Sequence, residues 1–227
     1  MLLQPVRLRA IFASFVMADL LTGSALWVSV GFTLANMAGA AVAWLILHKQ
    51  SERDLQMEGQ YSGLLVFYGS GVASIVSALI GGTISVYAFN IPLVKGLVMW
   101  WTGEWMNAMI ILPFLLALPT VRKTVLPHDR AQGLALVLPV VAVVLLEAAS
   151  YTVGSKVGSL VFSLPALIWC ALTYRIITTT LITMLVFATK VIAASAGSMD
   201  FTPAHYVDVA TLRLGITMLI LGPLSVA

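Results

Sequence analysis

The chain has 227 residues, of which 60% are hydrophobic and only 9% are charged. An ordinary soluble domain carries about 25% charged residues, so this composition excludes a soluble globular domain, a disordered tail and a nucleic-acid binder with a basic face. A helix that spans a membrane needs about 20 apolar residues. We therefore expect an all-α, polytopic transmembrane helix bundle of about seven or eight spans, with the lipid bilayer as its main partner.

Charged or turn-rich breaks divide the chain into eight apolar segments, each predicted to form a span or part of one. The break at Gly23–Ser24 carries no charge, but residues 10–47 are too long for a single span. The segment 159–174 is short and contains Pro165, which predicts a tilted, kinked or partial span. In chain order the segments are 8–23, 24–47, 61–88, 97–119, 133–153, 159–174, 176–197 and 209–227.

The basic residues predict the orientation of these spans, because cytoplasmic loops carry an excess of Lys and Arg. With the N-terminus in the cytoplasm, only Lys95 and Lys156 fall on the outer side. This bias requires an even number of crossings and places both termini in the cytoplasm. The basic residues on the inner side are Arg7, Arg9, Lys49, Arg53, Arg122, Lys123, Arg130 and Arg175.

Small residues recur every four positions on two of the predicted helices. This spacing puts them on one helical face, where they allow two helix backbones to approach closely. Internal packing of the bundle is the favoured interpretation, and a homodimer formed through one of these faces is the alternative. The two sets are Gly31, Ala35, Gly39 and Ala43, and then Gly69, Ala73, Ser77 and Gly81.

Five ionisable residues lie within the predicted spans, where each costs roughly 2.5–3.5 kcal/mol unless it is paired or hydrated. Counted from the predicted span ends, all five lie within roughly 6–11 Å of the outer boundary. They could form structural acid–base pairs, or they could line a polar pocket that binds a small ligand or a proton from outside. These candidates for signal sensing are Asp19, Glu104, Glu147, Lys190 and Arg213.

The other polar residues predict structural roles and no catalysis. Asn36 lies mid-span, where we expect it to form an interhelical hydrogen bond. The three histidines fall in loops and are expected to be solvated, so no metal site is predicted. No phosphate-binding Gly-rich loop with Lys and no HExxH motif is present. We expect neither an enzyme nor a cofactor in this chain.

Four stretches, in a fixed order, carry a similarity to a known family. Their order and spacing over about residues 8–227 resemble the first-described class of bacterial membrane-associated sensor (MASE) domains. Two features differ: Gly39 stands where members often have an acid, and members usually begin with one or two more helices. The latter implies that this chain is N-terminally short. The stretches are 34–49 with Asn36, 76–82, Trp101-Thr102-Gly103-Glu104 followed by Ile110 to Pro113, and 164–172.

The resemblance implies a single integral membrane sensory domain over residues 1–227, in the bacterial inner membrane and not itself catalytic. Such domains precede a cytoplasmic output, which is a histidine kinase of a two-component system or an enzyme of cyclic-di-GMP signalling. By motif position, Trp101 joins Glu104 among the sensing candidates. Two alternatives remain open: a small transporter or permease-like protein, and a scaffold that recruits a partner through loops 48–60 and 120–132.

Overall fold

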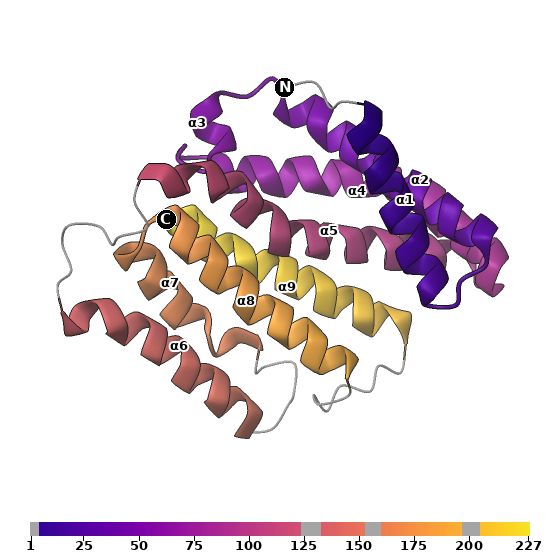
Figure 1. Cartoon of the computed structure of the whole chain (residues 1–227). Coiled ribbons are helices and arrows are strands. Elements are labelled where there is room, and N and C mark those ends of the chain that lie inside the picture. Colours follow the sequence, from indigo (N-terminus) through magenta and orange to yellow (C-terminus); the bar gives the residue numbers. More distant parts are fainter. Residues whose placement is uncertain (1–4, 124–132, 153–159, 197–204) are drawn as a thin grey trace. The chain divides into compact units, whose positions relative to one another are not determined.

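The computed structural model describes residues 5–123, 133–152, 160–196 and 205–227. Over these ranges the chain is helical and contains no strand, which confirms the predicted all-α class for the described part (Figure 1). The α-helices are α1 (Pro5–Leu21), α2 (Leu26–Leu47), α3 (Glu52–Leu55), α4 (Ser62–Phe89), α5 (Leu93–Ala117), α6 (Leu134–Thr152), α7 (Leu164–Thr173), α8 (Ile176–Ser195) and α9 (Tyr206–Val226), and the 3₁₀ helix η1 (Leu118–Lys123) follows α5.

Each of the eight predicted apolar segments overlaps one of these helices. The break between the first two is confirmed, because Gly23 adopts a φ of 87° in the turn that separates α1 from α2. Six helices in the described residues are long and apolar enough to cross a membrane: α2, α4, α5 with the start of η1, α6, α8 and α9. Since α7 has only ten residues and α1 has 17, the count of about eight spans stays a prediction.

Contacts divide the chain into two compact units, which are described separately. The first unit comprises residues 1–48 and 69–104, and the second comprises residues 49–68 and 105–227. The helices α4 and α5 each contribute one part to both units. The units therefore interleave along the sequence.

In the first unit, the two predicted faces of small residues pack against each other. A Cβ atom added to Gly39 of α2 would lie 3.1 Å from the Ser77 Cβ and 3.3 Å from the Ala73 carbonyl oxygen of α4. Ala35, one turn earlier on α2, has no exposed surface. Internal packing is thereby confirmed as the role of these faces. A homodimer stays a prediction, and it would have to form through other surfaces.

The closest approach in this unit lies between α4 and α5. A Cβ atom on Gly82 would lie 2.8 Å from the Leu97 Cα, and one on Gly96 would lie 2.6 Å from the Gly82 carbonyl oxygen. Next to this crossing, the Trp100 indole lies over Gly81 and donates its N–H to the Ser77 hydroxyl at 2.9 Å. Glycine is therefore needed where the two helix backbones meet, and the indole fills the space beside them.

In the second unit, α6, α7, α8 and α9 lie side by side (Figure 1). The face that α8 buries carries unusually polar residues, namely Thr179, Thr180, Thr183 and Lys190, together with Phe187. The C-terminal end of α9 packs against the start of α4, because a Cβ atom on Gly63 would lie 3.3 Å from the Leu224 carbonyl oxygen. A buried lysine on a membrane-type helix requires a partner.

Of the alternatives predicted for the segment 159–174, the structure excludes a kink at Pro165 inside the helix and agrees with a short, partial one. Helix α7 begins at Leu164, so Pro165 occupies its first turn, where a missing N–H and a fixed φ are tolerated. The helix ends after Thr173, and the Tyr174 hydroxyl then donates a hydrogen bond to the Leu136 carbonyl at the start of α6.

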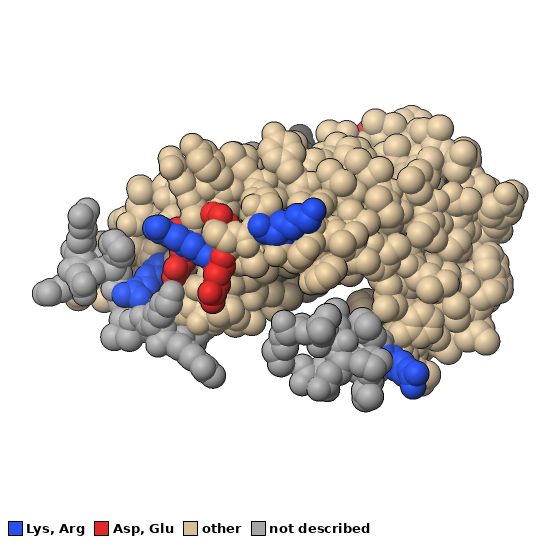
Figure 2. Space-filling view, turned by 90° about the horizontal axis from the view of Figure 1, so that it is seen from above, with Lys and Arg blue, Asp and Glu red and all other residues tan. Residues whose placement is uncertain are grey.

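The surface of the described residues is largely apolar. Figure 2 shows one face on which uncharged residues cover most of the area and charged side chains are few. Many large apolar side chains are exposed on helices that could span a membrane, among them Trp27 of α2 and Leu145 of α6. An exposed apolar surface of this extent fits contact with lipid and supports a membrane location.

Candidate functional site

Two of the predicted intramembrane charges form an ion pair. The Lys190 Nζ of α8 lies 3.0 Å from a Glu147 carboxylate oxygen of α6. The Lys190 side chain has no exposed surface, and that of Glu147 is 16% exposed. An ion pair at this distance offsets part of the desolvation of both charges. The pair joins α6 to α8, and α6 is a helix with few buried residues of its own.

Several polar atoms in the same unit are buried without a hydrogen bond. Among the described residues, neither Glu147 carboxylate oxygen has a hydrogen-bond partner beyond the ion pair, and the Thr183 and Ser163 hydroxyls have none. Buried polar atoms without hydrogen bonds are costly, and they are more frequent at sites that bind or switch. The Glu147 carboxylate therefore has a capacity for hydrogen bonds that the described residues do not use.

Arg213 lines a pocket of about 230 Å³ in the second unit. The walls come from the end of α8, from one face of α9 and from Met106 of α5. They are apolar apart from the guanidinium and the Ser195 hydroxyl, which donates to the Val191 carbonyl oxygen at 2.9 Å. A charged group at the edge of an apolar pocket gives it one strong point of recognition.

The remaining sensing candidates belong to the first unit. Asp19 and Glu104 are both partly exposed, on α1 and α5. The Trp101 indole N–H points to the Gly71 carbonyl oxygen of α4 at 3.4 Å, which gives it a structural contact. Of the five charges, the structure brings together Glu147 and Lys190, and a common layer of all five stays a prediction.

The tryptophans of α5 have a role that the sequence interpretation missed. Trp105 repeats the pattern of Trp101 one turn later, since its indole N–H donates to the Phe67 carbonyl oxygen at 3.0 Å. Its ring centroid lies 4.8 Å from that of Phe67. Tryptophans four residues apart on an apolar helix were a sequence signal for such a role, because a buried indole needs an acceptor.

We expect Trp105→Phe to lower the free energy of unfolding by about 1–3 kcal/mol, because it removes the hydrogen bond to Phe67 and leaves a small cavity. Trp169→Phe is the matched control, since that ring is 43% exposed, and we expect a change within about 0.5 kcal/mol. Denaturation of both variants in the same micelles measures the difference. Equal losses for both would contradict the anchoring role of Trp105.

The carbonyl oxygen of Asn36 does not form the interhelical hydrogen bond that the sequence predicted. That oxygen is buried and has no hydrogen-bond partner among the described residues, and neither has the Thr33 hydroxyl three residues earlier. The Asn36 carbonyl oxygen is therefore a buried acceptor without a hydrogen bond among the described residues.

The histidines in the described ranges have local partners. The His48 ring stacks on Trp44 and its Nδ1 lies 3.0 Å from the Trp44 carbonyl oxygen. The His205 backbone N–H donates to Asp208 at the start of α9. His128 lies outside the described residues. In the part of the chain that the structure describes, no group of three His, Cys, Asp or Glu could hold a metal ion.

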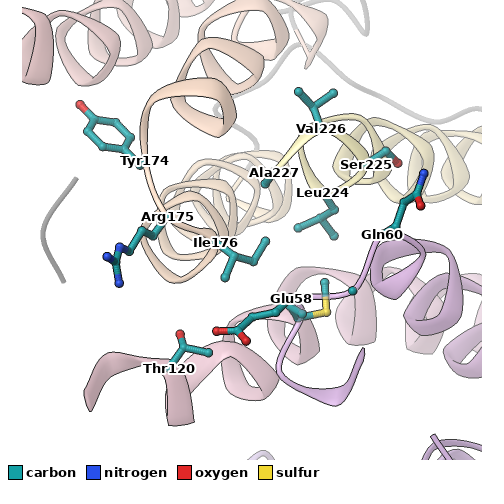
Figure 3. A pocket seen from close by; sticks show the side chains of 12 residues that line it. Glu58, Gln60, Thr120, Tyr174, Arg175, Ile176, Leu224, Ser225, Val226 and Ala227 are labelled. Atoms are coloured by element: carbon teal, nitrogen blue, oxygen red, sulfur yellow. The ribbon is translucent and has the colours of Figure 1, made fainter. Parts of the chain in front are cut away.

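A larger pocket, of about 490 Å³, lies in the second unit around the end of α9. Figure 3 shows its lining side chains, which come from four separate segments of the chain. The segments are the turn 57–60 with Glu58, Thr120 of η1, the junction 174–176 with Arg175, and residues 224–227 of α9. The sequence interpretation placed 57–60 and Thr120 in the inner loops 48–60 and 120–132 of the scaffold alternative, and Arg175 on the inner side. It assigned the other lining residues to spans and predicted no pocket there.

Comparison with known proteins finds two related sequences. The chain is 25% identical over 219 residues to "Probable diguanylate cyclase DgcF" of Escherichia coli O157:H7, a match that covers 95% of this chain and 45% of the relative. It is 30% identical over 131 residues to the protein of the same name in Escherichia coli strain K12, covering 56% of this chain and 40% of the relative. No protein-family model and no solved structure matches.

The extent of these matches is as informative as their identity. The chain spans less than half the length of the curated relatives that it matches. The longer match nevertheless takes in nearly all of this chain. The similarity thus relates this chain, with its six membrane-type helices, to less than half of longer proteins that are named probable diguanylate cyclases.

Proposed function

We propose that this chain is the membrane-embedded sensory part of a bacterial cyclic-di-GMP signalling protein, and that it is not catalytic itself. The observation that carries the proposal is the match over 95% of the chain to less than half of a probable diguanylate cyclase. More than half of that relative lies outside the match, which leaves room there for the cyclase. The resemblance to MASE sensor domains also supports a membrane sensory part that is separate from the enzymatic part.

The proposed location is the bacterial inner membrane, with both termini in the cytoplasm. Six helices with spanning length and composition support a membrane location. The excess of basic residues in the predicted inner loops supports the orientation. In this arrangement the last helix, α9, would lead to the cytoplasmic output.

The proposed mechanism is a shift of helix packing between two states. The sensing candidates are Asp19, Trp101, Glu104, Glu147, Lys190 and Arg213. Among them, the Glu147–Lys190 pair has the most direct means of action, because breaking it would release α6 from α8. Helix α8 packs against α9, whose inner end lines the larger pocket. A change at the pair could thus reach the cytoplasmic end of α9 through two helix contacts.

A hybrid protein tests this function. Residues 1–227 replace the matched part of the O157:H7 relative, and cyclic di-GMP is measured by mass spectrometry in cells that lack their own cyclases. We expect the hybrid to produce cyclic di-GMP, residues 1–227 alone to produce none, and Glu147→Gln or Lys190→Met to change the output of the hybrid. The Arg53→Gln variant of the exposed helix α3 serves as control.

Two results would contradict the proposal. Synthesis of cyclic di-GMP by residues 1–227 alone would show that the chain is an enzyme. Unchanged output from both charge variants, combined with solute uptake by the purified chain in proteoliposomes, would favour the transporter alternative.

A further inference from the structure

The pocket around Arg213 has an unusual combination of shape and charge. On α9, Val209, Leu212, Arg213 and Ile216 follow the spacing of a single helical face. On α8 the facing residues include Val191 and the small Ala194, which leaves space between the helices. The result is an apolar pocket of about 230 Å³ with one guanidinium on its wall.

The position of Arg213 makes an anion the complementary ligand. It lies two turns after the start of α9 at Tyr206, or about 10 Å along the helix. Arginine stays charged in this environment and its guanidinium has five N–H donors in a planar fork. Arg213 also interacts within the chain, and five donors allow it to keep that contact while binding a carboxylate.

The size of the pocket limits the apolar part of the ligand. A water molecule occupies about 30 Å³ in the liquid and a methylene group is of similar size, so 230 Å³ corresponds to roughly eight such groups. That volume suits a single short hydrocarbon tail.

We propose that the pocket between α8 and α9 binds a medium-chain carboxylate, with the carboxylate on Arg213 and the tail against Val191, Leu212 and Ile216. This carboxylate would be the signal that the proposed sensory domain detects, so its biological meaning rests on the proposed function. A ligand seated between α8 and α9 would change the packing of these two helices. Binding itself is measured on the chain without any output domain, so its failure is separate from failure of the proposed function.

The test measures binding of radiolabelled octanoate to the full chain in phosphatidylcholine nanodiscs, with empty nanodiscs subtracted. We expect saturable binding that Arg213→Gln weakens by about tenfold to a hundredfold, because a charge-assisted hydrogen bond is lost. Ala194→Leu keeps the cation and fills the pocket, and it should weaken binding as well. Arg213→Lys should bind with intermediate affinity, and Arg53→Gln on α3 should bind like the unchanged protein.

Several outcomes would overturn the proposal. Octan-1-ol binding as tightly as octanoate would show that the pocket does not recognise the carboxylate. Octanoate binding that survives both Arg213→Gln and Ala194→Leu would place the ligand elsewhere. Absence of octanoate binding, together with Arg213-dependent thermal stabilisation by phosphatidylglycerol in the nanodiscs, would assign the pocket to a membrane lipid.

Discussion

Gly82→Ala is expected to lower the free energy of unfolding by about 1–3 kcal/mol, and Gly82→Val by more. The added Cβ would lie 2.8 Å from the Leu97 Cα and 3.0 Å from the carbonyl carbon and oxygen of Gly96. All three are backbone atoms, so no side-chain rotation can relieve the contact and α4 must move away from α5. Reversible denaturation in micelles, followed by helix content, measures the loss.

Gly215→Ala is the matched control because a Cβ added there meets no atom within 4 Å. Both residues lie inside helices, where alanine is favoured over glycine by about 1 kcal/mol. Gly215→Ala is thus expected to leave stability unchanged or raise it slightly. The free energy of unfolding should therefore be clearly lower for Gly82→Ala than for Gly215→Ala. A stabilised Gly82→Ala variant would mean that α4 and α5 do not meet at Gly82 and Gly96.

The small-residue faces show how far sequence reasoning reaches in this fold. A spacing of four identifies the packed face of one helix, and the faces of α2 and α4 were predicted correctly from it. The register between two helices depends on where their backbones cross. The spacing of residues along one helix does not specify that crossing point. The contact between Gly82 and Gly96 is of this kind. The position of the Trp100 ring against Gly81 depends on the same register.

The candidate site, too, could be predicted from the sequence only in part. Hydropathy and helix rise were enough to predict that Glu147 and Lys190 lie at similar depth. Three acids and two bases at that depth allow several pairings, and the choice depends on which helices are neighbours. Helix α6 packs beside α7 and also reaches α8 through Glu147, a contact that hydropathy along the chain does not specify.

Lys190→Met is expected to destabilise the protein by about 3–5 kcal/mol, because it leaves the Glu147 carboxylate buried without its cation. The 16% exposure of the Glu147 side chain gives it some access to solvent, which favours the lower end of this range. Glu147→Leu should also be destabilising, since Lys190 has no exposed surface. Unfolding in micelles, measured for both single variants under the same conditions, gives the two costs.

The double variant Glu147→Leu with Lys190→Met separates stability from signalling. Replacing both members of a buried ion pair by apolar residues of similar size is often neutral or stabilising, so the double variant should recover most of the stability that each single variant loses. If the pair served only to hold α6 against α8, the hybrid cyclase carrying the double variant would respond to its signal like the unchanged protein. If breaking the pair is the switch, the double variant should be stable and fixed at one level of cyclic-di-GMP output. A double variant as unstable as Lys190→Met would instead show that the two side chains are not partners.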